Sequence, residues 1–219
     1  MNLFELEFSH YLYQIITNYD DSLTDLNIII NDSLDLNNKT HIQGLINWLN
    51  RWGCRHISIE SHEELKNNII IWWNTHIDLI DKIKIEDKKD IIKIFDSLST
   101  VVVSDTDKKL IRLGPTATAK ILFIINNKIF IPWDIKIRKD YGNSGSAYYK
   151  LIIDANNEIF KMKKELNIHE NKWKTIIRNR FPNYISDMKL MDEYYWITKT
   201  KNIKINKEQI ENIIKDEDV

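Results

Sequence analysis

The chain has 219 residues, of which 43% are hydrophobic and 11% aromatic, a composition that excludes a disordered protein and supplies enough apolar residues for a buried core. Only five Gly and three Pro favour long helices over many strands and turns. The single cysteine excludes an intramolecular disulfide, and no apolar run is long enough to span a membrane. We therefore expect an all-α protein of the cytoplasm, without a signal peptide.

The net charge of −1 conceals an uneven distribution of charge along the chain. Residues 1–105 contain nine Lys or Arg and 17 Asp or Glu, whereas residues 106–219 contain 22 and 15. Such an asymmetry indicates a surface that meets an anion such as nucleic acid. The alternative is that the two oppositely charged halves attract each other.

Apolar residues recur at helical spacing through most of the first half of the chain. They predict helices over residues 4–16, 41–54, 61–80 and 86–103. The third of these begins with a capping pattern, Ser61 followed by Glu64. The acidic segment from Asp20 to Lys39 is predicted to be a loop.

One group of residues in this half has the side chains that metal sites use: His56, Glu60, His62, Glu63 and His76. Their spacing matches neither an H-E-x-x-H helix nor a paired Cys/His site. We therefore expect surface and capping roles for them, with no metal ion and no other cofactor.

The most distinctive segment of the chain covers residues 107–142. It predicts a short helix over 107–113, a tight turn at Gly114-Pro115 and a second helix over 116–126, because glycine ends helices and proline is favoured at their first position. The free N–H groups at the start of that second helix suit a phosphate oxygen.

A loop through Pro132-Trp133-Asp134 then leads into a basic helix. Between residues 108 and 139 there are eight Lys or Arg and one acidic residue, Asp134. Further helices are predicted over 144–164, 172–181 and 187–198. Residues 208–219 are predicted to form an amphipathic turn or two that frays into an acidic tail.

This order of elements resembles the helix-hairpin-helix DNA glycosylase superfamily, whose hairpin reads approximately L-P-G-x-G-x-K-T-A. Leu113-Gly114-Pro115-Thr116-Ala117 corresponds to the second half of that hairpin, and residues 133–138 to the aspartate segment that follows it. Arg112 stands in place of the first hairpin glycine. The four-cysteine iron–sulfur motif of some members is absent, since Cys54 is the only cysteine.

The resemblance implies one all-α unit over residues 1–219 with two helical lobes and an active-site cleft between them. The lobes correspond to residues 30–126, which end in the hairpin, and to residues 1–29 with 127–219, which carry Asp134. In that family the aspartate stabilises positive charge on the sugar and orients a water molecule. Without the resemblance, the residues by themselves favour Asp134 as only the cap of the following helix.

The resemblance also implies a double-stranded DNA partner and a monomeric protein that extrudes a nucleotide from the duplex. Two flat side chains beside the aspartate, Trp133 and Tyr141, are the candidate base pocket. The residues expected to contact the DNA backbone are Leu113, Gly114, Pro115, Thr116, Ala117, Lys120, Lys136, Arg138 and Lys139.

The expected activity is that of a monofunctional DNA glycosylase, which releases a base and leaves an abasic site. Thr116 stands where lyase members carry their Schiff-base lysine, and Lys120, one turn further on, is expected to contact phosphate or solvent. The excised base is a damaged base in DNA repair or a hypermodified phage base in antiviral defence. The alternatives are a non-catalytic helix-hairpin-helix DNA-binding protein and a helical interaction module.

Overall fold

A computed structural model of the chain describes residues 1–206, apart from 32, 55–56, 59–60 and 107–108. It confirms a mostly helical protein and adds one small antiparallel sheet. The segment 208–219, predicted as an amphipathic turn or two and an acidic tail, lies outside the described residues. In chain order the elements are α1 (Leu3–Ile16), α2 (Tyr19–Ile30), α3 (Lys39–Arg51), α4 (His62–Ile80), α5 (Lys88–Ser99), β1 (Val102–Thr106), β2 (Lys109–Arg112), α6 (Gly114–Ile125), α7 (Ile135–Lys139), α8 (Gly145–Glu165), α9 (Glu170–Arg180), α10 (Asp187–Tyr195) and the π-helix η2 (Trp196–Thr200).

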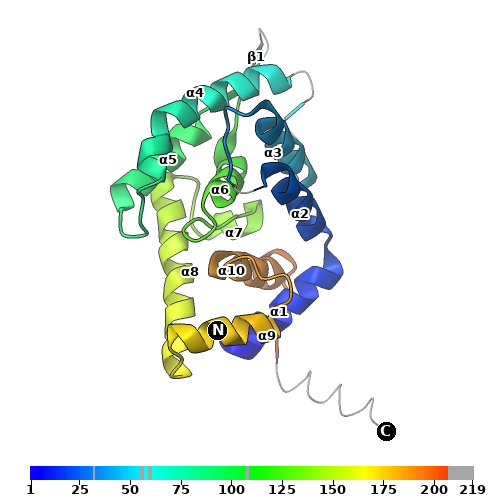
Figure 1. Ribbon diagram of the computed structural model, residues 1–219, viewed down its shortest axis with the longest axis vertical. Coiled ribbons are helices and arrows are strands. Elements are labelled where there is room, and N and C mark those ends of the chain that lie inside the picture. Colours follow the sequence, from blue (N-terminus) through cyan, green and yellow to red (C-terminus); the bar gives the residue numbers. More distant parts are fainter. Residues whose placement is uncertain (32, 55–56, 59–60, 107–108, 207–219) are drawn as a thin grey trace.

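Helix α6 lies at the centre of the molecule (Figure 1). Seven consecutive residues, Ala117–Phe123, are buried, so the helix is enclosed on all sides, as an apolar central helix requires. Helices α3 and α5 pack against it. Its start is the predicted turn: Gly114 has φ +73°, which favours glycine, and Pro115 stands in the first turn of the helix.

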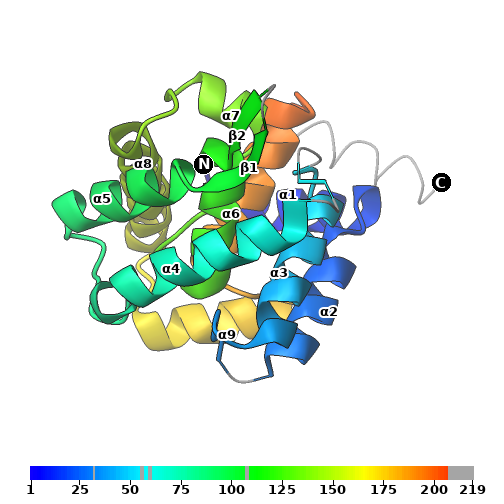
Figure 2. The same cartoon turned by 90° about the horizontal axis from the view of Figure 1, so that it is seen from above.

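The other helices surround α6. Helix α8 runs along one side and packs on α5 and α10, whereas α2 and α3 form an antiparallel pair on the other side (Figures 1 and 2). Helix α1 packs on α10 and η2. Segments from both ends of the chain therefore meet beside the central helix.

The predicted loop from Asp20 to Lys39 is wrong for its first half, which forms α2. Asp20 and Asp21 lie in the first turn of that helix, where the helix dipole stabilises carboxylates. Leu23 and Leu26 are buried one turn apart. The acidic residues that indicated a loop are thus a favourable helix start.

The predicted helix over 107–113 is also wrong for residues 109–112, which form strand β2, and the predicted helix over 86–103 ends at Ser99. Strand β1 pairs with β2 in antiparallel register, with Asp105 opposite Leu110 and Val102 opposite Arg112. A run of three valines at 101–103 favours a strand, because β-branched side chains fit a pleated surface. The element that precedes the Gly114 turn is therefore a β-hairpin.

Candidate active site

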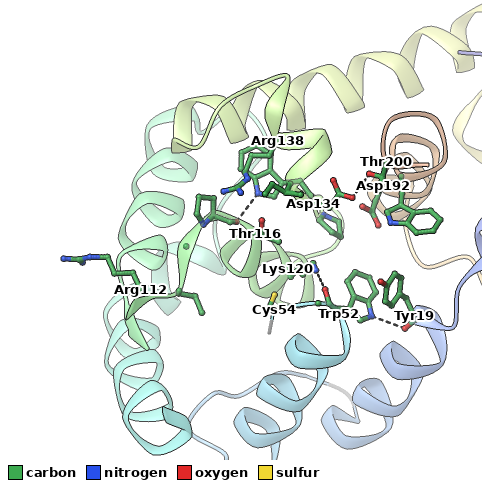
Figure 3. Close-up of a pocket in the computed structure, with 18 of the residues that line it drawn as sticks. Tyr19, Trp52, Cys54, Arg112, Thr116, Lys120, Asp134, Arg138, Asp192 and Thr200 are labelled. Carbon is green, nitrogen blue, oxygen red and sulfur yellow. Dashed lines mark hydrogen bonds between the residues drawn. The ribbon is translucent and has the colours of Figure 1, made fainter. Parts of the chain in front are cut away.

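A pocket of about 830 Å³ opens where four parts of the chain meet. One wall is formed by β2 and the start of α6, and a second by residues 132–138. Tyr19, Trp52 and Cys54 line a third side, and α10 with η2 the fourth (Figure 3). The pocket thus takes residues from both ranges that the sequence assigned to separate lobes.

The lining of this pocket combines flat side chains with charged ones. Five aromatic residues line it: Tyr13, Tyr19, Trp52, Trp133 and Trp196. Its acidic residues are Asp134 and Asp192, and its basic residues are Lys109, Arg112, Lys120, Arg138 and Lys201. Such a pocket has faces on which a planar group can stack and an excess of positive charge for an anionic backbone.

Asp134 is the N-cap of α7 and lines the pocket. Its Oδ1 accepts hydrogen bonds from the backbone N–H groups of Lys136 at 2.7 Å and Ile137 at 2.9 Å. Its Oδ2 accepts one from the hydroxyl of Thr200 in η2. The capping role that the sequence allowed is therefore present, and it fixes the direction of the carboxylate (Figure 3).

Trp133, a candidate base-pocket residue, lies at the pocket wall with its ring in the core. It is fully buried, and its ring meets Phe95 and Tyr148 edge-on. Its indole N–H donates to the carbonyl of Pro115 at 3.0 Å. Trp133 thereby ties the loop before Asp134 to the turn that starts α6.

Tyr141, the other base-pocket candidate, is not among the residues that line this pocket. It borders a separate surface cavity with Asp154 and Tyr195. Burial and the neighbouring Asp154 raise the pKa of Tyr141 to about 12. The structure therefore does not bring Tyr141 and Asp134 into one cavity.

The predicted backbone-binding residues are divided between the pocket and its surroundings. Residues 113–116 and Arg138 line the pocket. Burial lowers the pKa of the Arg138 guanidinium, and the nearby carboxylate of Asp134 acts in the opposite direction. Ala117 is buried in the core. Lys136 and Lys139 are exposed on α7 outside the lining.

Lys120 lies in the pocket rather than on the outer surface of the protein, since only 7% of it is exposed. Its ammonium donates to the carbonyl of Trp52 and lies 5.6 Å from the centre of the Trp52 ring. Cys54, which also lines the pocket, has its thiol pKa raised by burial, so it remains a neutral thiol.

Asp192 is the acidic site residue that the sequence did not indicate; Tyr19, Trp52, Trp196 and Thr200 were not predicted either. Asp192 belongs to α10, where it is 6% exposed, and it lines the same pocket as Asp134 (Figure 3). Burial raises its pKa to about 7, opposed by Lys189 and reinforced by the carboxylates of Glu193 and Asp134. A carboxyl group with this pKa can hold or release a proton near neutral pH.

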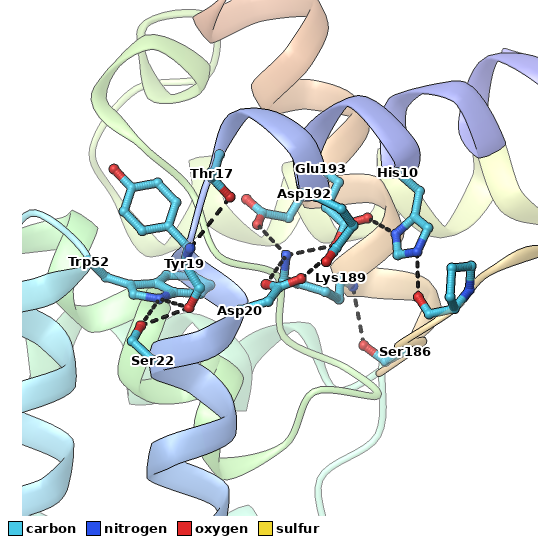
Figure 4. Close-up of polar contacts among 12 residues, drawn as sticks. His10, Thr17, Tyr19, Asp20, Ser22, Trp52, Ser186, Lys189, Asp192 and Glu193 are labelled. Atoms are coloured by element: carbon cyan, nitrogen blue, oxygen red, sulfur yellow. Dashed lines mark hydrogen bonds and ion pairs between the residues drawn. The ribbon is translucent and has the colours of Figure 1, made fainter.

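A buried ionic network stands behind Asp192 (Figure 4). The ammonium of Lys189 lies 2.8 Å from Glu193, 3.1 Å from Asp20 and 3.9 Å from Asp192. Burial by itself would lower the pKa of Lys189. The surrounding anionic groups, above all Glu193, have the larger effect and hold this pKa well above its usual value. The network joins α2 to α10.

His10 extends the network to α1. Its Nδ1 lies 2.6 Å from Glu193 Oε2, and its Nε2 lies 2.6 Å from the carbonyl oxygen of Pro182. The carbonyl oxygen of Pro182 can only accept, so Nε2 carries a proton, and the contact of Nδ1 with the Glu193 carboxylate favours the protonated imidazole. Burial alone would lower the His10 pKa, but the contacts with Glu193 and Pro182 raise it.

We predict that Asp192→Asn removes part of the pH dependence of stability. The folded-state pKa of about 7 exceeds the usual 3.8, so this carboxyl contributes stability that is full at low pH and is lost as pH rises towards 7. The free energy of unfolding of the Asn variant, relative to wild type, should therefore rise by up to about 1.4 kcal/mol per pH unit between roughly pH 4 and 7. Urea unfolding at several pH values measures this.

The control for this prediction is Asp140→Asn, which changes an exposed aspartate paired with Lys199. Its curve should run parallel to that of wild type. A parallel curve for Asp192→Asn as well would show that Asp192 ionises normally.

The described residues contain no group of three or more His, Cys, Asp or Glu placed to hold a metal ion, and His56 and Glu60 lie outside them. None of the helices in that part of the chain is both long and apolar enough to cross a membrane. Comparisons with family models, with curated proteins and with solved structures find no match to this chain.

Proposed function

We propose that the protein is a monofunctional DNA glycosylase that extrudes a damaged or modified base from double-stranded DNA and hydrolyses its bond to the sugar. The observation that supports this most is the presence of two carboxyl groups, Asp134 and Asp192, in one aromatic-walled pocket with a basic lining. The pocket draws on both proposed lobes and is the cleft between them. The enzyme acts as a monomer in the cytoplasm.

In this proposal the two carboxyl groups have different tasks. Asp134, held by two backbone N–H groups and Thr200, stabilises the positive charge that develops on the sugar as the base leaves. Asp192, whose pKa of about 7 lets it carry a proton, protonates the departing base. Water adds to the sugar carbon and loses a proton, which restores the carboxyl group.

The remaining lining residues support binding of the extruded nucleotide. Tyr19, Trp52 and Trp196 offer ring faces for the base. The turn over residues 113–116 and the side chain of Arg138 bind the phosphates, together with Lys136 and Lys139 on the exposed surface of α7 outside the lining. The excised base is either a damaged base in DNA repair or a hypermodified phage base in antiviral defence.

The reaction stops at the abasic site because no lysine stands at the hairpin position from which an amine would attack the sugar. Thr116 lacks an amine, and Lys120 places its ammonium against the carbonyl and ring of Trp52. A Schiff base requires an amine that is free to attack the sugar carbon, and the Nζ of Lys120 is occupied by Trp52 instead.

We predict that the protein releases a base from at least one genomic DNA in a panel of normal and phage-modified samples. Mass spectrometry of the soluble fraction identifies the base. The same reactions with borohydride should give no covalent protein–DNA adduct, and strand breaks should appear only after alkali. Release of nothing, with salt-sensitive DNA binding intact, would favour the non-catalytic DNA-binding protein. An adduct that disappears in Lys120→Ala would show that the enzyme is a lyase.

A further inference from the structure

Three residues of the pocket come from one continuous helical segment, α10 followed by η2. Asp192, Trp196 and Thr200 are spaced four residues apart, and all three line the pocket. In an α-helix, with about 3.6 residues per turn, each step of four residues turns the side chain about 40° beyond a full turn. Two such steps would turn Thr200 about 80° away from the direction of Asp192. An uninterrupted α-helix would therefore carry Thr200 away from the pocket.

The π-helix removes this rotation. In η2 the backbone N–H of Lys201 donates to the carbonyl of Trp196, five residues back, at 2.9 Å. This pattern makes a wider turn, so a residue four places further on stops short of a full turn. The wider turn returns Thr200 to the face that carries Asp192, and Figure 3 shows Thr200 beside Asp134. Such π-turns are rare and are frequently found at functional sites.

The two threonines at positions 198 and 200 of η2 use their hydroxyls differently. The hydroxyl of Thr198 donates to the carbonyl of Tyr194, four residues back, at 2.7 Å, which is a common local bond for a threonine in a helix. The hydroxyl of Thr200 donates instead to Oδ2 of Asp134, 66 residues away in the chain. The contact with the site thus takes the place of a local hydrogen bond.

The hydrogen bonds of Asp134 determine which of its oxygens can face a substrate. A carboxylate has about four acceptor sites, divided equally between its two oxygens. Oδ1 accepts from the backbone N–H groups of Lys136 and Ile137, whereas Oδ2 accepts from Thr200. Both sites on Oδ1 are therefore used, and the remaining site belongs to Oδ2. The direction of that site is set by the hydroxyl of Thr200.

We propose that Thr200 is a positioning residue, which turns the remaining acceptor site of Asp134 Oδ2 towards the sugar of the extruded nucleotide. This inference rests on the proposed function in that it takes Asp134 as the group that stabilises charge on the sugar. A charged group lowers a reaction barrier most when it is already oriented before the charge develops, because no reorganisation is then needed. A neighbouring side chain that fixes its direction supplies this orientation.

The experiment compares Thr200→Val, which removes the hydroxyl and keeps the shape, with Thr198→Val, the same change in the same π-helix. Single-turnover rates are measured on the DNA from which wild type releases a base. Thr200→Val should slow base release by about 10-fold, the effect of a slightly misplaced group, and should bind the DNA within about twofold of wild type, since no contact with DNA is lost. Thr200→Ser, which keeps the hydroxyl, should recover most of the rate. Thr198→Val should release the base at the wild-type rate.

A double-mutant cycle shows whether Thr200 acts through Asp134. In the Asp134→Asn background, Thr200→Val should change the rate by less than about twofold, because residues that act together have non-additive effects. A further loss of about 10-fold in that background would show that Thr200 acts on the fold instead. Equal rates for Thr200→Val and wild type would overturn the inference and leave the proposed function standing. Absence of base release by wild type from every DNA would overturn both.

Discussion

Replacing Asp134 with Asn is expected to lower the rate of base release by about 100-fold or more, the usual effect of deleting one preorganised electrostatic group. The substitution removes the negative charge and preserves the shape. Asn is as good an N-cap as Asp, so its Oδ1 retains the hydrogen bonds from Lys136 and Ile137, and its amide can donate to Thr200. DNA affinity should stay the same or increase, because a carboxylate near phosphates is removed.

Asp140→Asn is the matched control, since it neutralises an exposed aspartate at the other end of α7. It should release base at the wild-type rate. Single-turnover kinetics with the DNA identified by mass spectrometry give the rates, and fluorescence anisotropy gives the affinities. Wild-type base release by Asp134→Asn would remove Asp134 from the mechanism and leave it only the cap of α7.

Replacing Lys189 with Met is expected to lower the free energy of unfolding by about 3–5 kcal/mol, the cost of removing one partner from a buried ion pair. Lys189 is 1% exposed, and Glu193, Asp20 and Asp192 all lie within 3.9 Å of its ammonium. Met fills a similar volume, so packing is preserved. Stability is lost because the buried carboxylates are still removed from water but no longer have a cation to pair with.

The sign of the pH dependence distinguishes this cause from poor packing. Lys189 lowers the pKa of Asp192, which burial raises. Without the ammonium this pKa rises further above its unfolded value, so the stability that Asp192 contributes is present at low pH and lost as pH rises. The destabilisation should therefore be smaller at pH 5 than at pH 8 in urea unfolding. Lys161→Met, which changes an exposed pair with Glu165, should cost less than about 1 kcal/mol at either pH. Equal losses at pH 5 and pH 8 for Lys189→Met would show that the network does not depend on its charge.

The features that the sequence determined are those set by neighbours along the chain. Helical spacing of apolar residues placed most helices to within a few residues, because amphipathic periodicity is a local property. Gly114 and Pro115 specified the start of α6. Asp134 was identified both as a helix cap and as the lone acidic residue of a basic segment, and its capping hydrogen bonds lie within three residues.

The features that only the tertiary structure decided depend on contacts between distant segments. The β1–β2 ladder replaced a predicted helix because strand pairing, unlike a helix, takes its hydrogen bonds from another segment. Lys120, Lys189 and Asp192 have side chains that are usually exposed, yet all three are buried here. Lys120 has its partner, Trp52, in a distant segment, and Lys189 of α10 has one, Asp20, in α2. The packing of α1 against α10 helps to bury this region. Burial, which brings the pKa of Asp192 to about 7, is set by the whole fold and by no local pattern.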